Sequence, residues 1–191
     1  MPFDVLAVTP DLWPQLEDLF GKKGACNGCW CMYWRIGSAY HQRPREENRL
    51  ALNAIVEKGP PPGLLAFEAD VAVGWCQITP RADIRWIEGK RNLRGVDDAP
   101  VWSISCFYVG NKHRRRGVTR ALIEAAVDYA AKAGAAVVEA YPVDKTARKG
   151  TSNAFTGVAS SFAKAGFAEV ARRSPARPIM RKQLRAARPD S

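Results

Sequence analysis

The sequence contains no apolar run long enough to cross a bilayer, and it does not open with a basic segment followed by an apolar one. It has only two histidines, no zinc-finger pattern, no internal repeat and no low-complexity tract. Basic residues interleaved with aromatic ones, as on a nucleic-acid platform, are also missing. We therefore expect a cytoplasmic protein that has neither a membrane nor nucleic acid as its partner.

Acidic residues are scarce relative to basic ones. The 191 residues include 29 Lys and Arg against 19 Asp and Glu, which gives a net charge of +10. Such an excess favours an acidic cofactor or an anionic surface, although most of these charges are scattered and predict only a solvated exterior. The length and the 47% hydrophobic content suit one α/β domain. We place it at residues 1–182 and expect residues 183–191 to form a basic, flexible tail.

Residues 101–132 predict a strand, a turn and a helix. Residues 101–109 are rich in β-branched and aromatic types, and apolar residues recur at three- and four-residue spacing over 118–132. The first N–H groups of a helix lack internal acceptors and carry partial positive charge. Gly117 permits close approach there, and three consecutive arginines precede it. The turn therefore predicts a site for a phosphate or pyrophosphate, with an exposed basic turn as the alternative.

Arg114-x-x-Gly117-x-Thr119 resembles the Q/R-x-x-G-x-G/A motif of the GCN5-related N-acetyltransferases (GNAT), which binds the pyrophosphate of acetyl-CoA. Thr119 departs from the usual final glycine or alanine. The order of predicted elements from residue 5 to residue 181 also resembles this family. The resemblance implies the GNAT fold of the α/β class. This is a central mixed, mostly antiparallel sheet of about six or seven strands with a splayed parallel pair, flanked by about four helices.

The resemblance also implies acetyl-CoA as co-substrate and no metal. In the family, the strands at 101–109 and 136–141 would splay to admit the pantetheine arm, and a backbone N–H near 107–109 would polarise the thioester carbonyl. The implied coenzyme contacts are Phe107, Tyr108, Val109, Arg114, Arg115, Arg116, Gly117, Val118, Thr119 and Asn153.

The general acid is not identified. Family members often place a tyrosine in the run Y-x-K-x-G-F, where this chain has Phe162-Ala-Lys164-Ala-Gly166-Phe167. An asparagine seven residues earlier is replaced by Phe155, and Asn153 is close but out of register. For the base, Glu139 lies in an apolar strand, where burial would raise its pKa towards the working range. Tyr141 lies two residues on and shares its face. The alternatives for Glu139 are binding of a substrate ammonium, a salt bridge to an arginine, or a solvent-exposed face.

The segment Cys26-x-x-Cys29-x-Cys31 is followed by several aromatic residues. A structural zinc site needs four ligands, and only His41 lies near enough to complete a set, so we expect no metal. Cysteines among aromatic residues more often form an apolar wall, in the core or around a ligand. By the family resemblance this region would line the acceptor pocket, with core packing as the alternative. The candidate substrate-binding residues are Cys29, Trp30, Tyr33 and Trp34.

Other elements follow from periodicity and from glycine and proline stops. We expect helices at 9–20, 44–58 and 152–165, strands at 3–8, 64–68, 71–78, 167–172 and 178–181, and an irregular loop over the cleft at 80–99.

Together these features predict an N-acetyltransferase that moves an acetyl group from acetyl-CoA to a primary amine of a small molecule, by direct attack in a ternary complex. Direct attack needs no covalent intermediate, and a cysteine in a buried strand, such as Cys106, is usually an apolar filler. A protein lysine or N-terminal acetyltransferase, and a non-catalytic acyl-CoA sensor, are the alternatives. A homodimer is one state that the sequence allows.

Overall fold

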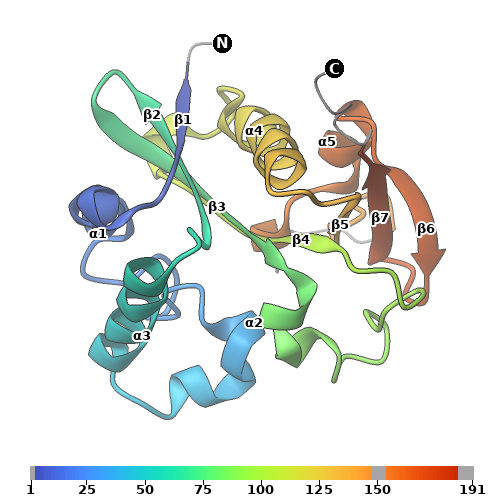
Figure 1. The fold of residues 1–191 in the computed structure, drawn as a ribbon, viewed down its shortest axis with the longest axis horizontal. Coiled ribbons are helices and arrows are strands. Elements are labelled where there is room, and N and C mark those ends of the chain that lie inside the picture. Colours follow the sequence, from blue (N-terminus) through green and yellow to red (C-terminus); the bar gives the residue numbers. More distant parts are fainter. Residues whose placement is uncertain (1–2, 148–153, 185–191) are drawn as a thin grey trace.

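The computed structural model describes residues 3–147 and 154–184. Its seven-stranded sheet has the order β1-β2-β3-β4-β5-β7-β6 (Figure 1). The strands are β1 (Asp4–Ala7), β2 (Gly63–Glu68), β3 (Val71–Pro80), β4 (Trp102–Val109), β5 (Val137–Ala140), β6 (Ala168–Arg172) and β7 (Pro178–Gln183). The α-helices are α1 (Trp13–Phe20), α2 (Tyr33–Ile36), α3 (Arg45–Lys58), α4 (Val118–Lys132) and α5 (Ala159–Lys164). Short 3-10 helices are η1 (Pro10–Leu12), η2 (Gly37–His41), η3 (Arg81–Asp83), η4 (Arg85–Ile87), η5 (Asn111–His113) and η6 (Ala154–Thr156).

The sheet is antiparallel except where β4 meets β5. Helix α4 connects these two strands, because a parallel pair needs a crossover rather than a hairpin. The predicted mixed, mostly antiparallel sheet with one parallel pair is therefore confirmed. None of the helices within the described ranges is both long and apolar enough to cross a membrane.

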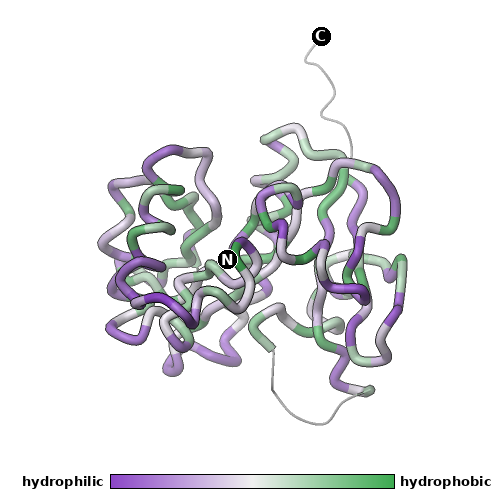
Figure 2. Tube along the Cα trace, turned by 90° about the horizontal axis from the view of Figure 1, so that it is seen from below, coloured by the Kyte–Doolittle hydropathy of each residue, from purple (hydrophilic) through white to green (hydrophobic). Residues whose placement is uncertain are grey.

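Helices cover both faces of the sheet. Figure 1 shows α4 and α5 on one side, and α1, α2 and α3 on the other. Strand β2 illustrates why both faces are apolar: Leu64 packs with the α4 side, whereas the next residue, Leu65, packs with the α1 and α3 side. In Figure 2 the hydrophobic colour follows the inner strands, and the hydrophilic colour gathers on outer helices and loops.

The helix predicted at 152–165 is interrupted. Of its residues 154–165, 154–156 form η6 and 159–164 form α5. Between them Gly157 has φ +81°, and its carbonyl accepts a hydrogen bond from the Val143 N–H at 2.9 Å. The apolar spacing alone could not show this break, because the segment bonds to the chain that follows β5 instead of to its own next turn.

The predicted contact Asn153 and most of the predicted tail, 185–191, lie outside the described residues. Gln183, the first residue of the predicted tail, is instead the last residue of β7 and pairs with Val137 of β5.

Candidate functional site

Strand β4 separates from β5 halfway along its length. The two strands pair only from Trp102/Val138 to Ile104/Ala140. Beyond Ile104, β4 keeps its other partner, β3, but within the described ranges it has no strand partner on the β5 side. The register against β3 also shifts between Gln77 and Ile78, which leaves Ser105 as the extra residue of a bulge. Backbone groups of an antiparallel strand alternate between its two sides, and Gly110 bonds to Val73 of β3. Of the three predicted residues, Phe107 and Val109 therefore present their backbone groups to the free edge, where an extended ligand can bind, whereas those of Tyr108 face β3.

The turn after β4 presents the start of α4. Gly117 caps the helix with φ +91°, and no side chain caps the free N–H groups. A Cβ placed on Gly117 would meet nothing within 4 Å, so the space beside Gly117 is open. Val118 is buried and fixes the first turn, whereas Thr119 is half-buried. The geometry fits a phosphate bound by backbone N–H groups at a helix start.

The three arginines of this turn have different surroundings. Arg116 pairs with Glu68 at the end of β2, and His113 contacts the same carboxylate at 3.0 Å. Arg114 donates from Nε to the Val109 carbonyl at 3.3 Å. Arg115 has a left-handed backbone, with φ +63°. The sequence did not show the Glu68 pair, because 48 residues separate the two partners.

On the opposite face of the sheet, α2 contacts the same stretch of β4. The Trp34 indole N–H donates to the Ser105 carbonyl at 2.9 Å, and this side chain is only 4% exposed. The Tyr33 ring lies edge-on to three other rings, those of Trp34, Tyr40 and Phe155, with centroids 4.7 to 6.1 Å apart. The predicted Tyr33 and Trp34 therefore gather in one aromatic group beside the point where β4 leaves β5.

Trp30 and Cys29 have other surroundings. Trp30 is buried and packs against Trp13 and Phe20, with ring centroids at 6.0 and 5.4 Å. This is the core packing that the sequence left as the alternative. Burial raises the pKa of the half-buried Cys29 thiol to about 12.

The third cysteine of the motif belongs to the interior. Cys31 is buried, accepts a hydrogen bond from the Trp75 indole at 3.1 Å, and lies 3.5 Å from Cys106, sulfur to sulfur. The hydrogen bond with Cys31, together with burial, raises the pKa of the Cys106 thiol well above its usual range. No group of three or more metal-binding side chains occurs among the residues that the structure describes.

Gln77 is a polar residue of this site that the sequence reasoning missed. It is fully buried beside the bulge, and its Oε1 accepts a hydrogen bond from the Ser105 hydroxyl at 3.2 Å. Its Nε2 is buried and has no partner in the described part of the chain. A glutamine within the apolar run 71–78 was the available signal, since a buried amide is normally paired.

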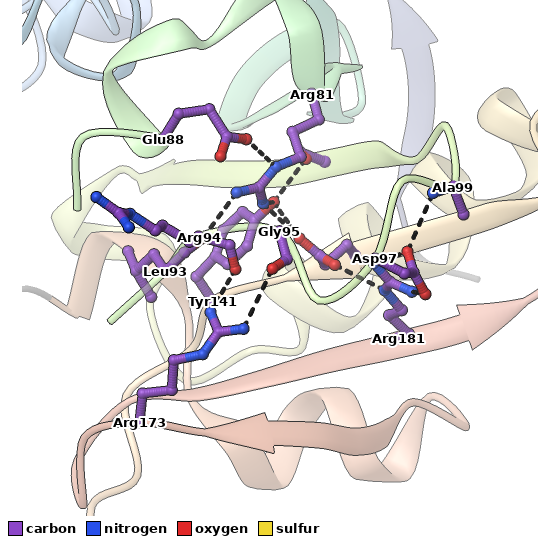
Figure 3. A network of polar contacts seen from close by, with 12 residues as sticks. Arg81, Glu88, Leu93, Arg94, Gly95, Asp97, Ala99, Tyr141, Arg173 and Arg181 are labelled. Carbon is purple, nitrogen blue, oxygen red and sulfur yellow. Dashed lines mark hydrogen bonds and ion pairs between the residues drawn. The ribbon is translucent and has the colours of Figure 1, made fainter. Parts of the chain in front are cut away.

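Glu139 and Tyr141 lie together, as predicted, in a buried polar network. Figure 3 labels Arg81, Tyr141 and Arg181 of this network. The fully buried Glu139 carboxylate accepts from Arg81 Nη1 at 2.5 Å, from Arg181 Nε at 2.7 Å and from the Tyr141 hydroxyl at 2.7 Å. These bonds correspond to the salt-bridge alternative: the carboxylate is shared by two guanidinium groups and has no exposed surface. Burial, and secondly the charge of Glu139, raise the pKa of Tyr141 well above its usual range, so its phenol stays neutral.

The same network fixes the loop that follows β3. Arg81 also donates to the Glu88 carboxylate and to the Leu93 carbonyl, at 2.5 and 2.7 Å. Arg181 on β7 pairs with Asp97 at 2.7 Å. The loop at 80–99 is thus held against β5 and β7 at several points, although the sequence predicted only an irregular segment.

Phe162 occupies the motif position at which family members often have a tyrosine. Its ring is fully buried, 6.1 Å from that of Phe107 and 5.1 Å from that of Phe167. The Phe162 side chain packs in the core and has no hydroxyl group that could donate a proton.

The model of the acetyltransferase (GNAT) family matches residues 28–149, which is more than half of the chain. The protein belongs to this family. It has the GNAT fold, as solved structures of other acetyltransferases also show. Over its whole length it matches the acetyltransferase yncA from Salmonella typhimurium, solved with acetyl-CoA, at 17% identity and a TM-score of 0.56, covering 99% of that chain.

Two further solved structures share this fold. PaiA N-acetyltransferase from Thermoplasma acidophilum, solved with coenzyme A, matches 96% of this chain and all of that chain at 14% identity and a TM-score of 0.55. A histone acetyltransferase HPA2-related protein from Corynebacterium glutamicum matches both chains completely at 17% identity and a TM-score of 0.56. At such identities the likeness shows the fold alone. No curated protein matches the sequence.

Proposed function

We propose that this acetyltransferase uses acetyl-CoA and transfers the acetyl group to a primary amine of a small molecule, by direct attack in a ternary complex. The observation that carries the proposal is the free edge of β4 beyond Ile104, which leads directly to the open helix start at Gly117. An extended chain can lie along such an edge while its diphosphate meets the helix start. Structures of two GNAT-fold proteins with coenzyme A or acetyl-CoA support the choice of ligand.

Acetyl-CoA would supply an activated acyl group as a thioester. The protein's part is to hold this group and to polarise its carbonyl, which the backbone N–H group of Phe107 or Val109 on the free edge would do. Cys106 does not take part as a nucleophile in this proposal, because the hydrogen bond with Cys31, and secondly burial, raise the pKa of its thiol well above the usual range.

The acceptor amine would reach the acyl group from the face covered by α2. There the rings of Tyr33, Trp34 and Phe155 offer an apolar wall whose faces attract an ammonium group before it loses its proton. Gln77 of β3 lies beside the bulge, bonded to Ser105. Its side-chain Nε2, which has no partner in the described structure, would donate to an oxygen of the substrate.

The proposal assigns Glu139 and Tyr141 first to positioning. Both are fully buried, and both are bonded to Arg81, which holds the loop above them. The base role predicted for Glu139 requires that a substrate, directly or through water, reach its fully buried carboxylate. The pH dependence of a Glu139→Gln variant separates these roles.

One observation favours a second candidate function, an acyl-CoA sensor without turnover. Phe162 occupies the family tyrosine's position without a hydroxyl, which removes a usual proton donor. A protein lysine or N-terminal acceptor is the remaining enzymatic alternative.

The deciding experiment combines binding and turnover. Calorimetry at low salt should show coenzyme A binding, and a thiol-release assay should show turnover with members of a primary-amine panel that includes a lysine peptide. Binding without turnover across the panel would favour the sensor, and turnover with the peptide alone would favour a protein acceptor. Absence of coenzyme binding would refute the proposal.

A further inference from the structure

A second basic site lies away from the Gly117 turn. A cavity of about 730 Å³ is lined by Arg91, Asn92, Arg94, Gly95 and Arg173. Four of these residues belong to the loop that follows β3, and Arg173 directly follows β6. Segments distant in the sequence therefore bring three arginines to one cavity.

The cavity holds Arg173 in a fixed position without neutralising it. Its Nη1 donates to the Arg94 carbonyl at 2.5 Å, and its Nη2 donates to the Gly95 carbonyl at 3.1 Å (Figure 3). These carbonyls orient the guanidinium plane but carry no charge. A preorganised guanidinium loses less entropy when it binds an oxyanion than a freely rotating one does.

Two acidic side chains of this loop, Glu88 and Asp97, already form ion pairs. Glu88 pairs with Arg81, and Asp97 pairs with Arg181. Among the residues that the structure describes, no carboxylate lies within ion-pair distance of Arg91, Arg94 or Arg173. The pKa of Glu88 is lowered chiefly by its hydrogen bond to Arg81 and to a smaller extent by Arg94, so the positive charge of the cavity is balanced only in part.

We propose that this cavity binds the phosphate group of a small molecule. Guanidinium groups match the geometry of phosphate oxygens, and a doubly charged anion gains most from several arginines around one space. The cavity is partly open to solvent, so an organic group attached to the phosphate can extend out of it. The site is separate from the diphosphate site proposed at Gly117, because none of its lining residues belongs to that turn.

The cavity is also connected to the buried network beside β5. Arg81 bonds both to the Leu93 carbonyl, next to the lining residue Arg94, and to the Glu139 carboxylate. A phosphate in the cavity would therefore fix the loop that covers this part of the sheet. This places the site where the phosphate of an acceptor could bind, a step that rests on the proposed function.

The binding test uses inorganic pyrophosphate as the probe, in calorimetry on protein saturated with coenzyme A. We expect binding that weakens with added salt, and an affinity about tenfold lower for Arg91→Gln and for Arg173→Gln. Arg91→Gln should disturb the fold less than Arg173→Gln, because the lining residue Arg91 makes no side-chain hydrogen bond in the described structure. Arg120→Gln, on the exposed face of α4 and paired only with Glu124, is the matched control and should bind as the wild type does.

The outcomes distinguish this site from the proposed function. No binding by the wild type, or equal affinity in Arg91→Gln and Arg173→Gln, would overturn the proposal even if coenzyme A binds. If coenzyme A does not bind, loss of pyrophosphate binding in these two variants but not in Arg120→Gln would still support it.

A kinetic comparison then identifies the source of the phosphate. Ethanolamine and phosphoethanolamine, a pair that differs only in the phosphate, would be compared as acceptors. A lower KM for the phosphorylated amine, lost in Arg91→Gln, would assign the site to the acceptor. Equal KM values together with pyrophosphate binding would assign it to a free phosphorylated ligand.

Discussion

Replacing Glu139 by glutamine tests the buried network directly. The substitution keeps the shape of the side chain and removes a charge that two guanidinium groups share. The carboxylate is fully buried, and the side chains of Arg81 and Arg181 are only 11% and 7% exposed. Removing one partner of a buried ion pair leaves the other charge uncompensated, at a cost of about 3–5 kcal/mol.

The expected cost is at the lower end of that range. Arg81 retains Glu88 and Arg181 retains Asp97, but these carboxylates are 53% and 50% exposed and therefore compensate only in part. We expect a loss of about 3 kcal/mol in the free energy of unfolding. For a protein of this length that corresponds to a decrease in Tm of roughly 6–12 °C.

Urea and thermal unfolding would measure this loss. Glu88→Gln is the matched control, because it removes a half-exposed carboxylate from the same Arg81 and should cost at most about 1 kcal/mol. A loss near or below 1 kcal/mol in Glu139→Gln would contradict the buried ion-pair role.

The same variant separates positioning from catalysis. If Glu139 is a positioning residue, Glu139→Gln assayed well below its Tm should keep the pH profile of the wild type. If it is the base, the rate should fall by about 10²–10⁴-fold, and the limb of the profile that reports its ionisation should disappear. Such a fall with wild-type stability would restore the base role.

Three further predictions concern the glycine at the start of α4, the hydrogen bond from Trp34 to β4, and the cysteines. Gly117→Ala should cost about 1 kcal/mol through its left-handed backbone and also weaken coenzyme A binding in calorimetry, whereas Gly134→Ala, at φ +82° just beyond the other end of α4, should cost the same and leave binding unchanged. Trp34→Phe leaves a buried carbonyl of β4 unpaired and should lower the free energy of unfolding by about 1–3 kcal/mol in urea. In thiol labelling at neutral pH, the exposed Cys26 should react fast and Cys29 slowly. Because burial raises the pKa of Cys29 from 9.0 to about 12, its contribution to stability should be present below pH 9 and be lost as the pH rises towards 12.

The sequence was sufficient for the elements whose signals are local. The strand at 101–109, the glycine turn and the helix at 118–132 occur as β4, Gly117 and α4, because β-branched content, apolar spacing and a glycine act within one segment. The parallel pairing of β4 with β5 also followed, since the length of the helical connection requires it.

Contacts between distant segments could not be predicted in the same way. Glu139 gave a visible signal as a carboxylate in an apolar strand, but its partners Arg81 and Arg181 lie 58 and 42 residues away among many other arginines. The Trp34 bond to Ser105 spans 71 residues. Spacing within a strand shows that a charge is buried, whereas only the folded topology shows which charge neutralises it.

The separation of β4 from β5 links the two parts of the candidate site, which are the free edge of β4 and the aromatic wall beside α2. A strand that loses a partner must satisfy its buried backbone groups by other means. In β4 the Ser105 carbonyl, at the bulge, is satisfied by the Trp34 indole of α2, and the Phe107 ring packs against Phe162 of α5. The groups that remain are those of the free edge, where we place the coenzyme. Because one strand carries both sets of contacts, binding along that edge and the position of the α2 aromatic wall should depend on each other.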